Sequence, residues 1–147
     1  LSSTTLLLST SMASDRADWT SWRGPLANGS VEEGNFPSKF DAKNHMWKTE
    51  LPGKGCSTPI VLNQRVFLTA PVDGNDALLC YDMNGSEQWR TTFGKENAGK
   101  HRNGSGSNAS PTTDGEAVFV YFKSGTFAAV ELDGSIRWKD DLVERFG

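Results

Sequence analysis

A tryptophan that follows a glycine by four residues occurs twice in this chain and constrains the fold more than any other feature. The two motifs are Gly85–Trp89 and Gly134–Trp138. Two apolar runs rich in Val and Phe, Ala117–Phe122 and Phe127–Leu132, precede the second motif and lack the i, i+3, i+4 spacing of a helix. Runs of this kind, bounded by Gly and Asp, predict short strands joined by tight turns.

The segment 58–89 contains the same sequence of apolar runs followed by a Gly-to-Trp motif. The offset is 52 residues at the first two strands and 49 at the Gly-to-Trp motif, so we expect Pro71–Asp76 to form a longer loop than Lys123–Thr126. Trp47 lies 42 residues before Trp89 and is an earlier occurrence of the repeated tryptophan. The matching segments are Thr58–Val61 with Ser110–Thr113 and Arg65–Leu68 with Ala117–Val120.

A repeat of roughly 40–50 residues with about four strands is typical of propeller blades. We therefore expect an all-β fold of antiparallel four-stranded blades. The fold is incomplete, because about two blades plus an N-terminal strand cannot close a ring of about four to eight blades. We therefore expect the chain to be an N-terminal fragment of a longer protein. The expected organisation is a leader at 1–14, an N-terminal anchor and loop at 15–44, and propeller repeats at 45–147, with a blade-closing strand at 45–51 and blades at 57–92 and 109–142.

The first fourteen residues carry a possible targeting signal. They are small and weakly apolar and end in Ser11-Met12-Ala13, a small-x-small pattern like a signal-peptide cleavage site. This favours export, with a periplasmic or outer-membrane-associated location; the alternative is a disordered leader. Just downstream, Trp19 and Trp22 precede Gly-Pro, which predicts an aromatic anchor ending in a turn.

Charge and cysteine content narrow the class of partner. A net charge of −3 and a pI near 5.3 argue against nucleic acid, and no stretch approaches the ~20 apolar residues of a membrane span. Cys56 and Cys80 could pair in an oxidising compartment. Cys80 lies in the expected strand Leu78–Tyr81, however, which favours a buried free thiol.

Two glycine-rich stretches resemble nucleotide-binding motifs but lack their context. In Leu51–Thr58, Gly55 stands where a phosphate loop needs Ser or Thr, and a strand follows where a helix is required. Gly104–Ala109 fits G-x-G-x-x-A, but no strand precedes it and no helix follows it.

The polar loop Phe93–Asn108 is the candidate contact site. It gathers Lys100, His101, Arg102 and Asn103, and loops on one face of a propeller are where ligands bind. The alternative, which we favour, is a solvated connection between blades.

Residues for catalysis or metal binding do not group in this sequence. His45 and His101 are too far apart to indicate a metal site. The adjacent carboxylate pairs point to opposite faces of an extended chain and make poor acid–base pairs; they are Glu32 with Glu33 and Asp140 with Asp141. No Ser/His/Asp arrangement is evident. The repeated residues have structural roles instead. Positive φ is expected at Gly85 and Gly134, and burial between neighbouring blades at Trp89 and Trp138.

At these residues the chain resembles the PQQ-like (quinoprotein-type) β-propeller repeat family, whose tryptophan motif runs A-x-D-x-x-T-G-K-x-x-W. Tyr81–Trp89 reads YDMNGSEQW and Val130–Trp138 reads VELDGSIRW. The Gly-to-Trp spacing is kept, while Thr-Gly-Lys is reduced to Asn-Gly-Ser and Asp-Gly-Ser. Asp18–Pro25, DWTSWRGP, is similar to the D-W-P-x-W-R-G-P start of exported bacterial proteins with this propeller.

The resemblance implies two classes of function. Quinoprotein dehydrogenases hold pyrroloquinoline quinone and Ca²⁺ at the propeller axis, whereas proteins similar to BamB of outer-membrane assembly bind no cofactor and act as scaffolds. We expect a non-catalytic scaffold without cofactor, whose partners are other cell-envelope proteins and the remaining blades. The alternative is part of a quinone-dependent alcohol or sugar dehydrogenase. A third possibility is glycan binding through Trp19 and Trp22.

Overall fold

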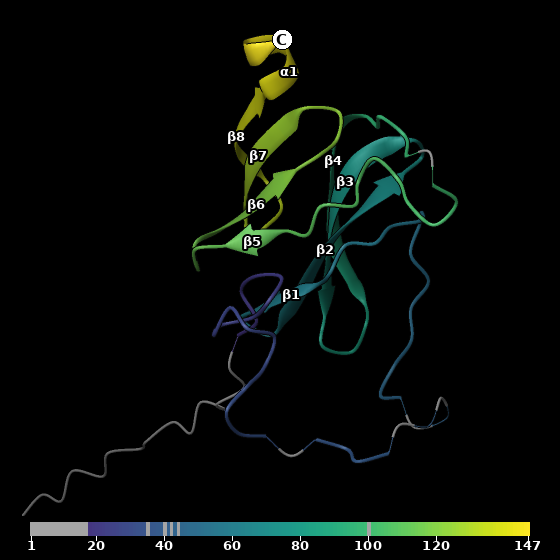
Figure 1. Cartoon of the computed structure of the whole chain (residues 1–147), viewed down its shortest axis with the longest axis vertical. Helices are drawn as coiled ribbons and strands as arrows, with labels where there is room; N and C mark the ends of the chain where they lie inside the picture. Colours follow the sequence, from purple (N-terminus) through teal and green to yellow (C-terminus); the bar gives the residue numbers. More distant parts are fainter. Residues whose placement is uncertain (1–17, 35, 40, 42, 44, 100) are drawn as a thin grey trace, which may run out of the picture.

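The computed structural model describes residues 18–147 apart from residues 35, 40, 42, 44 and 100; the expected leader at 1–14 lies outside them. The chain forms two four-stranded sheets followed by a short helix (Figure 1). The first sheet contains β1 (Ile60–Leu62), β2 (Arg65–Val72), β3 (Asn75–Asp82) and β4 (Glu87–Lys95). The second contains β5 (Thr112–Thr113), β6 (Ala117–Tyr121), β7 (Thr126–Glu131) and β8 (Ile136–Asp141), and α1 (Leu142–Phe146) follows.

Each sheet is an antiparallel meander in chain order. The tryptophan of the repeat occupies the same place in the fourth strand of both sheets, as the cross-strand register shows. The opposed residues are Phe67, Cys80 and Trp89 in the first sheet and Phe119, Ala129 and Trp138 in the second. The expected all-β fold of four-stranded antiparallel blades is confirmed.

The hairpin between β2 and β3 is tighter than the repeat offset suggested. The strands pair as far as Val72 and Asn75, so only Asp73 and Gly74 form the turn, with φ of 49° and 76°. Positive φ at both central residues is the turn geometry that matches the twist of a hairpin. The longer loop expected at Pro71–Asp76 is therefore wrong, because the additional residues lengthen the strands.

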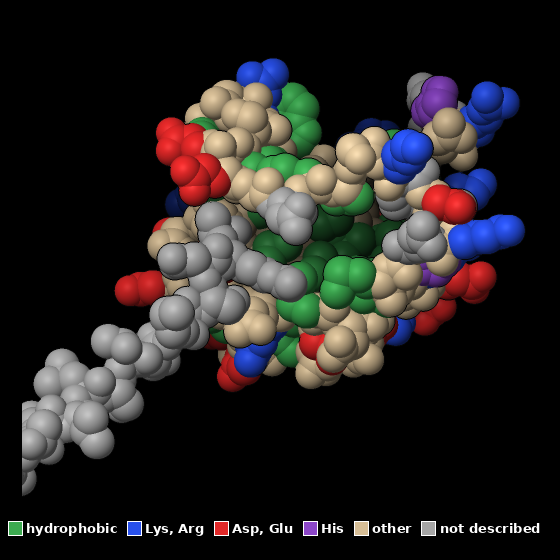
Figure 2. Space-filling view, turned by 90° about the horizontal axis from the view of Figure 1, so that it is seen from below, with side chains coloured by type: hydrophobic (Ala, Val, Ile, Leu, Met, Phe, Trp, Pro, Cys, Tyr) green, Lys and Arg blue, Asp and Glu red, His purple; other side chains and the backbone are tan. Residues whose placement is uncertain are grey.

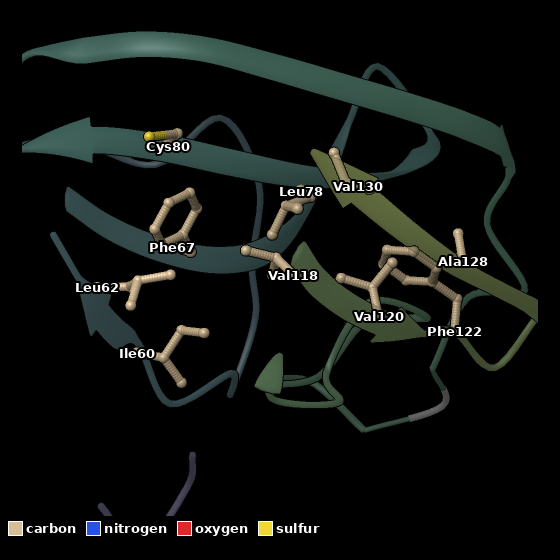
Figure 3. Close-up of a cluster of buried hydrophobic side chains, with 10 residues drawn as sticks. All are labelled: Ile60, Leu62, Phe67, Leu78, Cys80, Val118, Val120, Phe122, Ala128 and Val130. Atoms are coloured by element: carbon tan, nitrogen blue, oxygen red, sulfur yellow. The ribbon is translucent and has the colours of Figure 1, made fainter. Parts of the chain in front are cut away.

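The main core lies between the two sheets and uses one face of each. Side chains alternate along a strand, so Leu78 and Cys80 of β3 point toward the second sheet while Leu79 points away. Figure 3 shows this cluster at the junction of the sheets. Its buried members are Ile60, Leu62, Phe67, Leu78, Cys80, Val118, Val120, Phe122, Ala128 and Val130. Burial of each large apolar side chain stabilises the fold by about 1.5–3 kcal/mol.

A second buried cluster lies on the other face of the first sheet. Both β2 and β3 are consequently buried on both faces, which explains their nearly continuous apolar sequences. The N-terminal segment approaches this sheet closely at Gly53, where an added Cβ would lie 2.3 Å from the carbonyl oxygen of Pro71. The members of this cluster are Val66, Leu68, Ala70, Val72, Ala77, Leu79 and Tyr81.

The Asp18–Pro25 segment attaches to the first strand of each sheet, which is an edge strand. Trp19 exchanges two backbone hydrogen bonds of 2.8 Å with Val61 of β1, and the carbonyl of Thr20 accepts from the amide of Thr113 in β5 at 3.1 Å. Half-buried Trp19 also packs on Gly24. Trp22 is instead 61% exposed, beside Arg23. Of the two tryptophans, Trp19 is thus the one that packs.

Trp89 joins the two sheets by packing its indole on a turn of the second sheet. A Cβ added at Gly134 would lie 2.8 Å from Cδ2 of Trp89, so only glycine permits this approach. The indole Nε1 donates to the carbonyl of Leu132 at 3.1 Å, and Thr91 donates to the carbonyl of Gly134 at 2.5 Å. Gly134 has φ of 94°, the left-handed conformation expected of it.

Trp47 makes the same contact one unit earlier. A Cβ at Gly85 (φ 82°) would lie 2.6 Å from Cε3 of Trp47, and Nε1 of Trp47 donates to the carbonyl of Met83 at 2.8 Å. The strand expected at His45–Leu51 does not form, however, and the backbone there is irregular. A strand requires a partner ladder, and no strand of the described chain pairs with this segment.

Trp138 lies on the uncovered face of the second sheet. It is 39% exposed and contacts Phe127 and Phe119 of its own sheet, with ring centroids 5.0 and 6.3 Å away. Within the described chain, no further sheet packs against this face. The burial expected between neighbouring blades is therefore found for Trp89 but not for Trp138.

We predict that Gly134→Ala destabilises the fold more than Gly115→Ala. Both glycines have positive φ, 94° and 97°, so alanine is strained at either site by about 1–2 kcal/mol. A Cβ at Gly115 meets no atom within 4 Å, whereas a Cβ at Gly134 meets Trp89. The difference, about 1–3 kcal/mol for overpacking, is measured from urea unfolding midpoints. Equal midpoints would show that the indole contact contributes nothing.

We predict that Trp89→Ala lowers the free energy of unfolding of this chain by about 3 kcal/mol, because it removes a half-buried aromatic from the sheet interface. Trp138→Ala lowers it by only about 1 kcal/mol, because the indole is partly solvated. In a longer protein where a neighbouring sheet covers Trp138, the cost rises to roughly 3–5 kcal/mol. Chemical denaturation followed by circular dichroism tests the order of the two variants.

Candidate functional site

The connection from β4 to β5 is a compact loop, here called the inter-sheet loop, residues 96–109. Its second half is largely removed from solvent: Ser105, Gly106 and Ser107 are buried, and Asn108 and Ala109 are half-buried. An added Cβ at Gly106 would lie 2.8 Å from the carbonyl oxygen of Asn97, so the two halves of the loop touch. The sequence favoured a solvated connection between blades, and this description fits only the exposed tip of the loop.

A buried polar contact fixes the base of this loop to the first sheet. The Ser107 hydroxyl donates to Oδ1 of Asp76 at 2.6 Å, and both residues are fully buried. Thr69 Oγ1 lies 2.9 Å from the carbonyl of Ser107 and 2.7 Å from that of Ala109. Oδ2 of Asp76 is buried without a hydrogen-bond partner among the described residues. A buried carboxylate depends strongly on each hydrogen bond it retains.

Further hydrogen bonds hold the loop along its length. The amide of Gly106 donates to Oε2 of Glu96 at 2.9 Å, and Lys123 of the second sheet donates through its amide to the carbonyl of Gly106 at 3.1 Å. On the other side, Oδ1 of Asn108 accepts from the amides of Ser105 and Cys56 at 3.0 and 3.2 Å. The loop is therefore attached to both sheets and to the N-terminal segment.

The tip of the loop presents the residues identified as a contact site. His101, Arg102 and Asn103 are exposed, while Lys100 lies outside the described residues. The tip is a turn: the amide of Gly104 donates to the carbonyl of His101 at 3.0 Å, and Nδ1 of His101 accepts from the amide of Asn103 at 3.3 Å. The Cys56 thiol donates to the carbonyl of Asn103 at 3.2 Å. These hydrogen bonds hold the exposed tip in a defined position.

A shallow hollow of about 280 Å³ lies beside the loop, between it and the end of β6. Tyr121 supplies an aromatic wall that is 47% exposed, and Lys123 supplies a charged one. The remaining wall consists of three small residues and an asparagine: Ser105, Gly106, Ala109 and Asn108. An open hollow of this kind suits a side chain or a peptide segment rather than an enclosed cofactor.

Sequence reasoning missed Asp76, Ser107 and Thr69. Two features of the sequence mark Asp76 and Ser107. Asp76 immediately precedes the apolar run Ala77–Tyr81, an unusual place for a carboxylate, and Gly104–Asn108 consists only of Gly, Ser and Asn. Small residues in a loop permit close backbone packing. What the sequence does not show is that the two segments meet, because they are 31 residues apart.

The two cysteines remain free thiols. Cys56 is exposed and Cys80 is buried, as favoured from the strand pattern. Burial raises the pKa of the Cys80 thiol to about 11, so it stays protonated at neutral pH. A protonated, enclosed thiol is neither a nucleophile nor a metal ligand.

The carboxylates with shifted pKa values stabilise turns. Backbone amides of Ala117 and Glu116 lower the pKa of Asp114, and Ser135 lowers that of Asp133. A hydrogen bond from Arg137 lowers the pKa of Glu131. All three acids lie at hairpin ends, where local hydrogen bonds lower their pKa values. These pKa shifts therefore reflect the hairpin ends and do not indicate a catalytic site.

The adjacent acids Asp140 and Asp141 have separate structural roles. Asp141 caps α1, a helix that the sequence analysis did not expect, by accepting from the amides of Val143 and Glu144. Asp140 pairs with Arg145. Among the residues described, no three His, Cys, Asp or Glu side chains come together as metal ligands. The described chain also contains no helix long and apolar enough to cross a membrane.

We predict that Ser107→Ala frees the inter-sheet loop and speeds tryptic cleavage after Arg102. It removes the hydrogen bond from Ser107 to the buried carboxylate of Asp76, which costs about 1.5–3 kcal/mol. Ser86→Ala is the matched control, because Ser86 uses only its backbone in the hydrogen bonds of the described residues. Cleavage is followed by mass spectrometry under native conditions. Equal rates in both variants would contradict a fixed loop.

The model of the family described as outer membrane protein assembly factor BamB, a PQQ-repeat family, matches residues 39–146. No curated protein sequence gives a significant match to the chain.

Proposed function

The chain belongs to the family described as outer membrane protein assembly factor BamB, and on this premise we propose that it is part of a non-catalytic β-propeller scaffold for protein interaction in the cell envelope. Its two packed meander sheets act as neighbouring blades, and further blades complete the ring. The protein is exported, periplasmic or associated with the outer membrane. Its partners are other envelope proteins.

The observation that carries the proposal is the construction of the inter-sheet loop. Its base is fixed by the buried Asp76–Ser107 contact, and its tip at His101–Asn103 is exposed. A loop ordered before binding loses less conformational entropy when a partner contacts it. Exposed polar loops on a rigid β framework are the usual binding elements of such folds.

The alternative function is that of a quinone-dependent dehydrogenase. Its Ca²⁺ would need six to eight oxygen ligands, commonly with several carboxylates. Among the described residues, Asp76 is the buried carboxylate and accepts from Ser107, and no three His, Cys, Asp or Glu side chains come together as metal ligands. The described residues thus supply no Ca²⁺ ligand set, and the ordered inter-sheet loop is the observation that favours the scaffold.

Gene deletion and complementation test the proposal. We expect loss of the protein to lower the amounts of folded outer-membrane β-barrel proteins, measured by heat-modifiability on gels. The unaltered gene should restore them, and a gene with Gly-Ser-Gly in place of His101–Asn103 should not. Unchanged barrel proteins after deletion would overturn the scaffold. Quinone absorbance with alcohol-dependent reduction of a dye, in purified protein given the quinone and Ca²⁺, would establish the dehydrogenase.

A further inference from the structure

Two cationic side chains lie on the inter-sheet loop or bonded to it, and a third, Lys54, is exposed on the neighbouring N-terminal segment, although the protein as a whole is acidic. Arg102 is at the exposed tip, and Lys123 is bonded to the loop through its amide and, through Nζ, to the carbonyl of Ala98 at 3.0 Å. Lys54 is two residues before Cys56, whose thiol contacts the carbonyl of Asn103. Figure 2 shows Lys, Arg and His side chains at one edge of the molecule, with some acidic ones among them.

These cations are not neutralised within the described chain. Its ion pairs engage Arg90, Arg137 and Arg145, and none engages Lys54, Arg102 or Lys123. Of the acids that bond to the loop, Glu96 is half-buried and accepts from the buried amide of Gly106, and Asp76 is fully buried. Lys123 in the wall of the hollow and Arg102 at the exposed tip therefore present positive charge that no ion pair of the described residues balances.

The hollow adds an aromatic surface to this charge. Tyr121 and Lys123 form one wall, and the fixed segment 105–109 forms the other. A tyrosine ring provides contact area for a side chain, while exposed cations select carboxylates and steer their approach. With three cations rather than a long basic track, the surface is too small for a nucleic-acid backbone, which requires neutralisation of many phosphates.

We propose that the hollow and the loop tip together bind an acidic peptide segment of a protein partner. The carboxylates of the segment lie against Arg102 and Lys123, and a side chain of the segment packs on Tyr121. This inference rests on the proposed scaffold function and names the chemistry of its partner.

A peptide-binding measurement tests the proposal with the full-length protein. The probe is a fluorescein-labelled peptide of Asp, Glu, Gly and one Leu, and its comparison is the same peptide with Asn and Gln in place of the acids. We expect the acidic probe to bind more tightly by fluorescence anisotropy, and its binding to weaken as salt rises from 0.05 to about 1 M, where screening is nearly complete.

Variants locate the site. Arg102→Gln with Lys123→Gln should weaken binding of the acidic probe roughly tenfold, since each exposed ion pair contributes up to about a fivefold factor. Lys139→Gln is the matched control: it removes an exposed cation from β8, two strands away from β6, whose end borders the hollow, and should leave binding unchanged. Both proteins should give the same circular dichroism spectrum and unfolding midpoint, which separates lost contacts from lost folding.

Two results would overturn the proposal: equal affinity for the acidic and amide probes, or equal loss of affinity in the Lys139→Gln control. If either occurs while gene deletion still lowers barrel proteins, the scaffold function stands and the partner chemistry is wrong. If gene deletion has no effect but the acidic probe binds at this site, the surface is real and the assembly role is wrong.

Discussion

The contact on which the architecture depends is an indole packed against a glycine in the next unit of the repeat. Trp89 sits on Gly134 and donates to the carbonyl of Leu132. Neither meander would be stable alone, because a single sheet buries too little apolar surface on one face. The tryptophan, together with the core of Figure 3, makes two marginal sheets into one folded body. Trp47 repeats the contact on Gly85 from a segment that forms no strand.

The same arrangement positions the candidate functional site. Once the two sheets are packed, the chain must cross from the fourth strand of one to the first strand of the next. Its crossing, the inter-sheet loop, passes over the end of the shared core, where Thr69 and Asp76 replace apolar residues and bind Ser107. Polar groups at that end fix the loop through hydrogen bonds whose loss would leave buried groups unsatisfied. Fold stability and loop order are therefore linked through one interface.

Much of the fold could be predicted because its determinants are local. Short apolar runs, the Gly and Asp residues that bound them and the Gly85–Trp89 spacing each act over a few residues, and they predicted the meanders and the left-handed glycines. The predictions failed where the structure of a segment depends on the residues with which it pairs. The segment 45–51 has strand-like residues but no ladder to join, and the longer loop expected at Pro71–Asp76 became strand because a two-residue turn closes the hairpin well. The helix after β8 depends on its N-cap, Asp141. The sequence analysis considered this residue only as one of two adjacent carboxylates.

The sequence by itself determined the class of the protein: an all-β repeat of the family that matches residues 39–146, with tryptophans at fixed places. From composition it also identified Lys100–Asn103 as a candidate contact loop, beside the favoured alternative of a solvated connection. Only the tertiary structure decided which tryptophan is covered, that the base of the loop is buried, and that Asp76 meets Ser107. The reason is distance along the chain. Periodicity and turn chemistry act between neighbours, whereas burial and hydrogen bonding across 31 residues exist only once the sheets have packed.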